Sequence, residues 1–172
     1  QLNEQSMMLK VTGLQAGDGR GVYRNTQLDL RNYKKLQMWV HAESLIDDVT
    51  NLRSGELSMF IRLGTDVKNN FYEYEIPLAL TAPGRYNTYS LTDQQEVWPI
   101  SNFLDLNLQS LVNLKKERNV AKNQEGSGVG FGVLYTGRDP NNENNRKLQN
   151  QELTEIPKDS FFTKLKKIFM RF

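Results

Sequence analysis

Residues 57–78, with the sequence LSMFIRLGTDVKNNFYEYEIPL, decide the fold class of this chain. Apolar side chains alternate from Leu57 to Leu63 and again from Tyr72 to Leu78, which is the two-residue period of a half-buried strand. The residues between the two runs, GTDVKNN, tolerate turn geometry. The stretch therefore predicts an antiparallel hairpin with an exposed loop at a sheet edge.

Four further segments show alternation or turn signals that predict strands. They cover residues 7–11, 22–30, 35–42 and 128–136. In the last segment bulky side chains alternate with glycines, so one face is nearly bare and suits close packing against another backbone. Together with the hairpin, these strands predict a mainly β fold, and we expect a jelly-roll-like β-sandwich.

Two segments carry helical periodicity instead. Apolar residues recur every three or four positions over about residues 102–120, which predicts one helix packed on the sandwich. Residues 139–157 are expected to be a polar linker, because 139–151 alone hold five Asn and two Gln. Residues 158–172 place Phe, Leu and Ile on one face and predict a short amphipathic helix. The sandwich domain is thus expected to span residues 1–138.

The predicted tail helix is basic. It has one acidic residue, Asp159, and five cationic ones, Lys158, Lys164, Lys166, Lys167 and Arg171. A basic amphipathic helix suits weak contact with a membrane surface or insertion into a partner's groove. Packing of its apolar face on the sheet is an equally good interpretation.

Composition excludes several classes of function. The 172 residues include 22 Lys and Arg against 20 Asp and Glu, and this net charge of +2 creates no field that favours nucleic acid. The absence of cysteine removes disulfides, thiolate nucleophiles and thiolate metal ligands. No run approaches the ~20 apolar residues of a membrane-spanning helix, so a soluble domain is expected. The chain begins at Gln1, and we expect it to be a piece of a longer protein.

The sequence offers little catalytic chemistry. His41 is the only histidine and has no predicted partner cluster, so a packing or surface role is expected. Residues 126–132 are rich in glycine but precede a strand, whereas a phosphate loop precedes a helix. Glu73 and Glu75 share a strand face, and a solvent-facing sheet explains this pair without acid and base catalysis. We therefore expect no enzymatic activity, no metal and no cofactor.

Aromatic residues are better candidates for function. Tyr72 and Tyr74 alternate with apolar neighbours and are expected to point inward, whereas Phe71 and Trp39 fall on the opposite face. Exposed large aromatics mark contact surfaces, and a flat group of them would hold a sugar ring. The candidate contact surface combines the hairpin loop with nearby aromatics: Trp39, Asp66, Asn69, Asn70, Phe71 and Trp98.

Several segments resemble the SprA (Sov) family. They are residues 2–6, 17–23, 33–43, 60–66 and 69–78, together with Val97-Trp98-Pro99 and the helix end Glu117-Arg118-Asn119. The resemblance covers residues 2–142, and we identify no family sequence in residues 144–172. It implies a very large outer-membrane component of the type IX secretion and gliding-motility system of Bacteroidetes, located in the cell envelope.

The resemblance implies a translocon that works by geometry, so it supplies no catalytic residue. We expect a non-catalytic soluble domain that docks against outer-membrane secretion-system proteins or translocated cargo. The alternative is a carbohydrate-binding β-sandwich, which coplanar exposed aromatics would favour. A hydrolase would require a second carboxylate across a cleft from Glu73 or Glu75.

Overall fold

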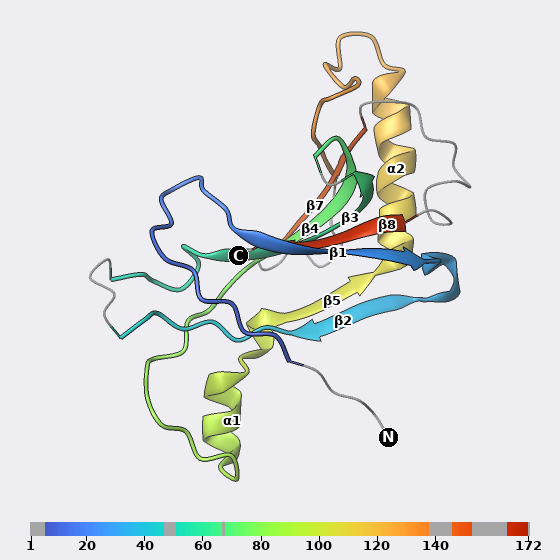
Figure 1. Ribbon diagram of the computed structural model, residues 1–172. Helices are drawn as coiled ribbons and strands as arrows, with labels where there is room; N and C mark the ends of the chain where they lie inside the picture. The colour runs from blue at the N-terminus through green and yellow to red at the C-terminus, as the bar shows by residue number, and fades with distance from the viewer. Residues whose placement is uncertain (1–5, 47–50, 67, 138–145, 153–164, 172) are drawn as a thin grey trace.

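The described part of the chain folds into two antiparallel sheets and two α-helices (Figure 1). The computed structural model describes residues 6–46, 51–66, 68–137, 146–152 and 165–171. The six-stranded sheet has the order β1-β8-β3-β4-β7-β6, and β2 pairs with β5 in a two-stranded sheet. The strands are β1 (Gly21–Leu28), β2 (Lys35–Trp39), β3 (Ser58–Asp66), β4 (Asn70–Pro77), β5 (Phe103–Asn107), β6 (Tyr135–Gly137), β7 (Lys147–Gln151) and β8 (Leu165–Arg171). The α-helices are α1 (Leu91–Val97) and α2 (Leu108–Lys122), with 3-10 turns at Leu30–Asn32 and Ile100–Asn102.

Strands β3 and β4 form the predicted hairpin at the centre of the large sheet. Met59 pairs with Ile76 and Ile61 with Tyr74, which puts the alternating apolar side chains of both strands on one face. At Gly64 the two strands approach so closely that a Cβ would overlap the Asn70 carbonyl oxygen. Only glycine fits at this point, and the register shifts immediately after it.

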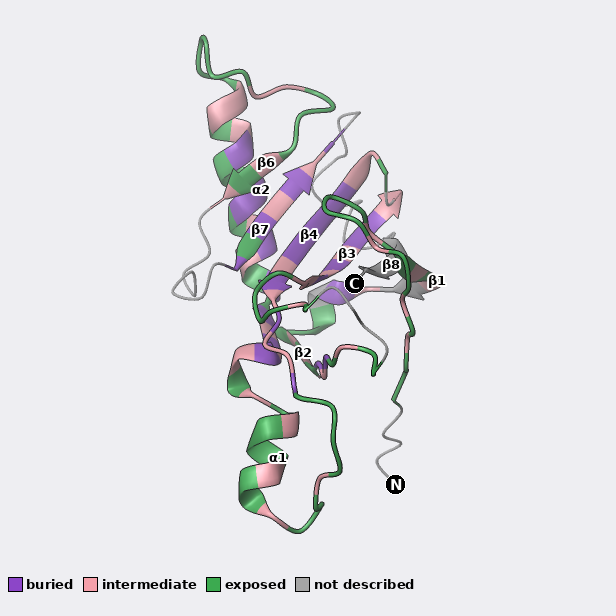
Figure 2. Ribbon diagram, turned by 90° about the vertical axis from the view of Figure 1, so that its left-hand side faces the viewer, coloured by how far each residue is buried: buried purple, intermediate pink, exposed green. Residues whose placement is uncertain are grey.

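The core lies between the large sheet and a second layer made of α2 and the β2–β5 pair (Figures 1 and 2). The large sheet contributes buried side chains from β3, β4 and β7, and the second layer contributes those of β5 and α2. This two-layer arrangement confirms the mainly β, sandwich-like fold class. The largest fully buried apolar side chains of this core are Met59, Leu63, Tyr72, Tyr74, Ile76, Leu78, Leu104, Leu111, Leu114 and Leu148.

Helix α2 confirms the predicted helix but begins later than expected. Residues 103–107, which were predicted to be helical, form β5 and pair with β2. The Asn107 side chain then caps the helix by accepting a hydrogen bond from the Gln109 amide at 3.0 Å. The apolar spacing that begins at Leu104 therefore belongs partly to a strand, whose inward residues continue the same buried face into α2.

The predicted polar linker is wrong for residues 147–151, because these form strand β7 inside the large sheet. The strand pairs with β4 and β6, and its two buried side chains are Leu148 and Asn150. Asn150 Nδ2 donates to the Phe71 carbonyl at 3.0 Å, which pairs the nitrogen of this buried side-chain amide. A polar composition suggested a loose segment, but backbone pairing with β4 and β6 and the hydrogen bond of Asn150 Nδ2 allow the strand to lie inside the sheet.

The predicted tail helix is also wrong where the structure describes it. Residues 165–171 form strand β8, which pairs with β1 on one side and β3 on the other. The apolar residues of this segment have a spacing that fits one face of a helix. The edges of β1 and β3, however, offer hydrogen bonds to its backbone on both sides, and the segment pairs with them as a strand. The remainder of that prediction, residues 158–164, lies outside the described residues. Residues 165–171 therefore do not form the amphipathic helix on which the expected membrane contact depended.

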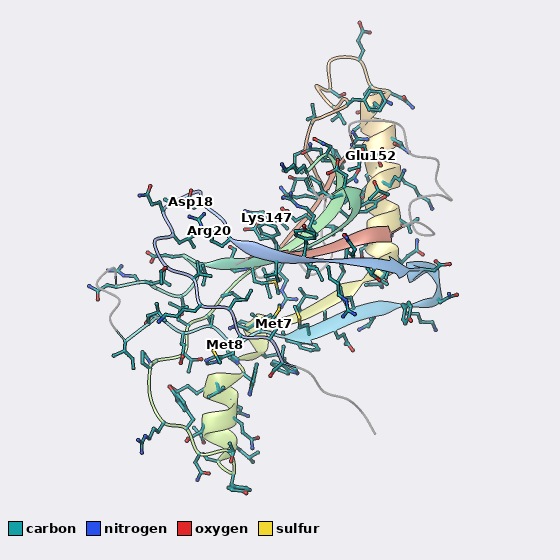
Figure 3. The ribbon with its side chains drawn as sticks, in the orientation of Figure 1. Met7, Met8, Asp18, Arg20, Lys147 and Glu152 are labelled. Atoms are coloured by element: carbon teal, nitrogen blue, oxygen red, sulfur yellow. The ribbon has the colours of Figure 1, made fainter. Side chains whose placement is uncertain are left out.

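Two predicted strands are wrong or shorter than expected. Residues 7–11 are not in a strand, and the Met8 side chain is 93% exposed (Figure 3). In the segment 128–136 the strand begins only at Tyr135, because Gly128 and Gly132 have φ angles of 69° and 76°, which interrupt an extended backbone. The strands expected over residues 22–30 and 35–42 are present as β1 and β2, which end earlier, at Leu28 and Trp39.

Candidate contact surface

The outward face of the β2–β5 pair carries an exposed group of rings, here called the aromatic cluster: Trp39, His41, Trp98 and Phe103. Strand alternation creates it, because Leu36 and Met38 face the core while Trp39, paired with Phe103, faces outward. Trp39 is 47% exposed and Trp98 is 44% exposed. Two half-exposed tryptophans, separated widely in sequence, thus lie together on one surface.

The rings of the aromatic cluster meet at steep angles. Trp39 and Phe103 have centroids 4.6 Å apart with an interplanar angle of 40°. Trp39 and Trp98 are 6.5 Å apart at 72°, an edge-to-face contact. The surface is therefore ridged, and Trp39 and Trp98 do not form the flat platform that would stack against a sugar ring.

His41 positions Trp98 by holding the end of helix α1. Its Nδ1 lies 2.9 Å from the Val97 carbonyl oxygen, and the Thr81 hydroxyl donates to the Glu96 carbonyl at 3.0 Å. These two carbonyls belong to the last turn of α1, where no backbone N–H of the same helix follows to satisfy them. The contact requires a proton on Nδ1, and Nε2 lies 3.6 Å from a Glu43 carboxylate oxygen. His41, two residues after the end of β2, therefore contacts both the end of α1 and the ring of Trp98.

A polar group lies on the same face of the β2–β5 pair. The Lys35 ammonium is 2.9 Å from one Asp105 oxygen, and the Gln37 amide donates to the other at 3.1 Å. Hydrogen bonding from Lys35 is the main cause that lowers the pKa of the Asp105 carboxyl, against an opposing contribution from burial. The face thus has an aromatic end and a charged end.

The hairpin loop is distant from the aromatic cluster. It lies at the opposite end of the molecule from α1 in both ribbon views (Figures 1 and 2). Asp66 accepts hydrogen bonds from the Lys68 amide at 2.9 Å and the Asn69 side chain at 2.8 Å, so its carboxylate organises the turn. Of the predicted contact residues, the structure brings Trp39 and Trp98 together and places Asp66, Asn69 and Asn70 elsewhere.

Phe71 does not belong to an exposed surface, contrary to expectation. Its side chain is buried, and the Arg62 guanidinium lies 3.7 Å from the centre of its ring. Arg62 also binds Glu73, with Nε 2.8 Å from the carboxylate. Glu73 is only 5% exposed, so the solvent-facing explanation for the Glu73 and Glu75 pair is wrong for Glu73. Each glutamate has its own cation, since Glu75 lies 3.5 Å from Lys147.

A buried ionic cluster, missed by the sequence analysis, lies between α2 and the end of β7 (Figure 3). Its members are Lys115, Arg118 and Glu152. Arg118 lies 3.2 Å and Lys115 3.1 Å from different oxygens of the Glu152 carboxylate. Burial raises the pKa of the neighbouring Tyr72 hydroxyl, and the Glu152 charge adds to this effect. The signal in the sequence is weak, because these charges come from a helix and a polar segment far apart.

The ionic cluster also fixes the glycine-rich connection that follows α2. Arg118 donates to the Gly130 carbonyl at 2.9 Å, and the Gly132 amide donates to the Glu152 carbonyl at 2.9 Å. Arg146 has a similar bridging role, since it donates to the Phe103 carbonyl at 2.8 Å and to the Tyr74 hydroxyl at 3.3 Å. Buried charge in this fold thus joins the two layers.

Within the described residues, His, Asp and Glu side chains form no group of three that could hold a metal ion. No helix among those residues has the length and apolar character needed to cross a membrane.

Comparison with known proteins identifies the family. No curated protein matches the chain. The SprA_N family model, described as a motility related/secretion protein, matches residues 1–163. The match extends beyond residue 142, so the expectation that family sequence is absent from residues 144–172 is wrong as far as residue 163. The chain therefore belongs to the SprA_N family of motility related/secretion proteins.

Proposed function

We propose that this chain is a non-catalytic docking domain of a large outer-membrane component of the type IX secretion and gliding-motility system. Its role is to contact other envelope proteins of that system or the cargo that they translocate. Membership of a motility and secretion family supports this assignment. The surface proposed for contact is the aromatic cluster on the β2–β5 pair.

The single observation that carries the proposal is the contact between half-exposed Trp39 and Trp98. Tryptophan is enriched among residues that dominate binding energy at protein interfaces. Both indoles are already held by neighbours, Trp39 by Phe103 and Trp98 by His41. A partner therefore meets a pre-organised surface, which reduces the entropy lost on binding.

The ion pairs of the domain support a structural role. Arg62 with Glu73 joins two strands, and the buried ionic cluster joins a strand to a helix. Glu73 and Glu75 each lie beside their own cation, an arrangement that neutralises the two carboxylates and holds neighbouring strands together.

The test uses the whole chain as bait in cross-linked envelopes of a bacterium that carries a SprA-family secretion system. Truncation at residue 142 is unsuitable, because it removes β7 and β8 from the sheet. The test variant is Trp39→Ala combined with Trp98→Ala. The matched control is Tyr33→Ala, since Tyr33 is an exposed aromatic outside the aromatic cluster.

Recovery of outer-membrane secretion-system proteins by the wild-type chain and by Tyr33→Ala, with loss in the double tryptophan variant, supports the proposal. Equal recovery by all three baits contradicts the assignment of the contact to the aromatic cluster. Retention of polysaccharide that depends on the two tryptophans, without recovery of protein, favours the carbohydrate-binding alternative.

A further inference from the structure

Strand β8 lies inside the large sheet although it comes from the far end of the chain. It runs antiparallel to β1, with Val22 opposite Met170, and antiparallel to β3, with Ile61 opposite the same residue. Strands β1 and β3 consequently run parallel to each other, with one strand between them. Because neighbouring strands are about 4.8 Å apart, the edges of β1 and β3 face each other across about 10 Å.

Among the described residues, β8 is the sole sheet partner of β1. Strand β3 has a second partner in β4 and keeps it whether or not β8 is present. The attachment of β1 to the sheet therefore depends on an extended segment in the space between β1 and β3, here called the strand slot.

The strand in the slot lies outside the residues that the family model matches. The family match ends at residue 163, whereas β8 begins at Leu165. Both edges of the slot, β1 and β3, lie within the matched residues. Both edges of the slot thus belong to the matched region, and the strand between them follows it in the chain.

The slot has a defined preference for its occupant. Residues Ile168 and Met170 pair with Leu63 and Ile61, whose own side chains are buried, so the register favours apolar residues at alternate positions. Backbone N–H and C=O groups on both edges require an extended occupant that can hydrogen-bond on two sides.

We propose that the strand slot is a binding site for an extended peptide strand, that residues 165–171 are its resident occupant, and that a separate polypeptide with the same sequence pattern can replace them. Recognition is by strand addition, in which main-chain hydrogen bonds supply affinity and alternate side chains supply specificity. This proposal goes beyond the proposed function and does not depend on the aromatic cluster.

The first experiment opens the slot in the full-length chain with Ile168→Pro combined with Phe169→Pro. Consecutive N–H groups of a strand point to opposite sides, so the two prolines remove a donor toward β1 and a donor toward β3. A fluorescent peptide of residues 164–172, KLKKIFMRF, is then added and its anisotropy measured. Controls are the wild-type chain, the peptide with the same two prolines, and a scrambled peptide of the same composition.

We expect saturable binding of one peptide per variant chain, at least tenfold tighter than binding to the wild-type chain or of either control peptide. A variant that unfolds cooperatively but binds the native and scrambled peptides equally, or binds neither, overturns the proposal.

A second measurement needs no substitution and applies if the proline variant does not fold. Hydrogen exchange of the wild-type chain should show β1 and β8 amides exchanging together, through an opening that leaves β3 and β4 protected. Excess unlabelled KLKKIFMRF should alter exchange in β1. If the β8 amides are as well protected from exchange as those of β4, and exchange in β1 does not respond to the peptide, the proposal that the occupant of the slot can be replaced is overturned. Neither measurement involves a secretion partner, so failure here leaves the proposed function standing.

Discussion

Arg118 donates to the Glu152 carboxylate across 3.2 Å in the interior of the protein, and the Arg118 side chain is only 1% exposed. Lys115 approaches the other carboxylate oxygen from the same helix. The Glu152 carboxylate thus contacts two cations where water is largely excluded. Removal of a buried partner leaves charge uncompensated, which costs more than the pair itself contributes.

Glu152→Gln is expected to lower the free energy of unfolding by about 3–5 kcal/mol, because it removes the carboxylate that lies beside the buried Arg118 guanidinium. Urea denaturation followed by circular dichroism measures this change. The control is Glu75→Gln, which removes a carboxylate from a partly exposed pair with Lys147 and should cost no more than about 1 kcal/mol. Equal effects of the two substitutions would contradict a special role for the buried ionic cluster.

Gly137→Ala is expected to destabilise the domain by about 1–3 kcal/mol through overpacking. A Cβ at this position overlaps a Leu114 methyl group, because α2 packs directly against the end of β6. The control is Gly130→Ala, where an added Cβ meets nothing within 4 Å. Thermal unfolding of both variants provides the comparison, and an unchanged melting temperature for Gly137→Ala would show that α2 is packed less closely.

Asp105 should contribute to stability in a way that depends on pH. Its folded-state pKa is lowered, chiefly by the hydrogen bond from Lys35, so its contribution is present above the unfolded pKa of about 3.9. The contribution is lost as pH falls through the folded pKa. Asp105→Asn should therefore cost up to about 1 kcal/mol near neutral pH and nothing in strong acid. Urea unfolding across this range checks the result, and a constant difference at every pH would contradict it.

The contact between the two tryptophans should have an optical signature. Trp39 and Trp98 are the only tryptophans of the chain, and edge-to-face indoles couple their electronic transitions. We expect a paired band of opposite signs in the circular dichroism spectrum, which Trp98→Phe abolishes. His41→Leu removes the donor to the Val97 carbonyl and should weaken the band. A band that is unchanged in His41→Leu would contradict the positioning role of His41.

The central hairpin could be predicted because its pattern is local and unambiguous. Residues 57–63 and 72–78 alternate strictly and flank a turn-forming loop, so neither strand depends on distant sequence to set its inward face. The same reasoning identified Trp39 as outward-facing. Both tryptophans of the aromatic cluster were therefore selected from sequence, although their contact was not.

The remaining features depend on partners far away in the chain. Strand β7 resembled a linker because its polar residues become compatible with burial only through contacts such as that of Asn150 with the Phe71 carbonyl. Strand β8 resembled a helix because a seven-residue segment with clustered apolar residues fits either period. The placement of Trp98 beside Trp39 depends on His41 and Thr81, which hold the end of α1. None of these long-range contacts has a short sequence signature.

The position of β8 also dictates when the fold can be completed. Strand β1 is synthesised well before its described sheet partner β8, because most of the described chain lies between the two strands. Such pairing has a high contact order and forms slowly, because the ends of a long intervening segment must meet. A polypeptide that crosses a membrane from its N-terminus would therefore travel with β1 unpaired until β8 has also crossed.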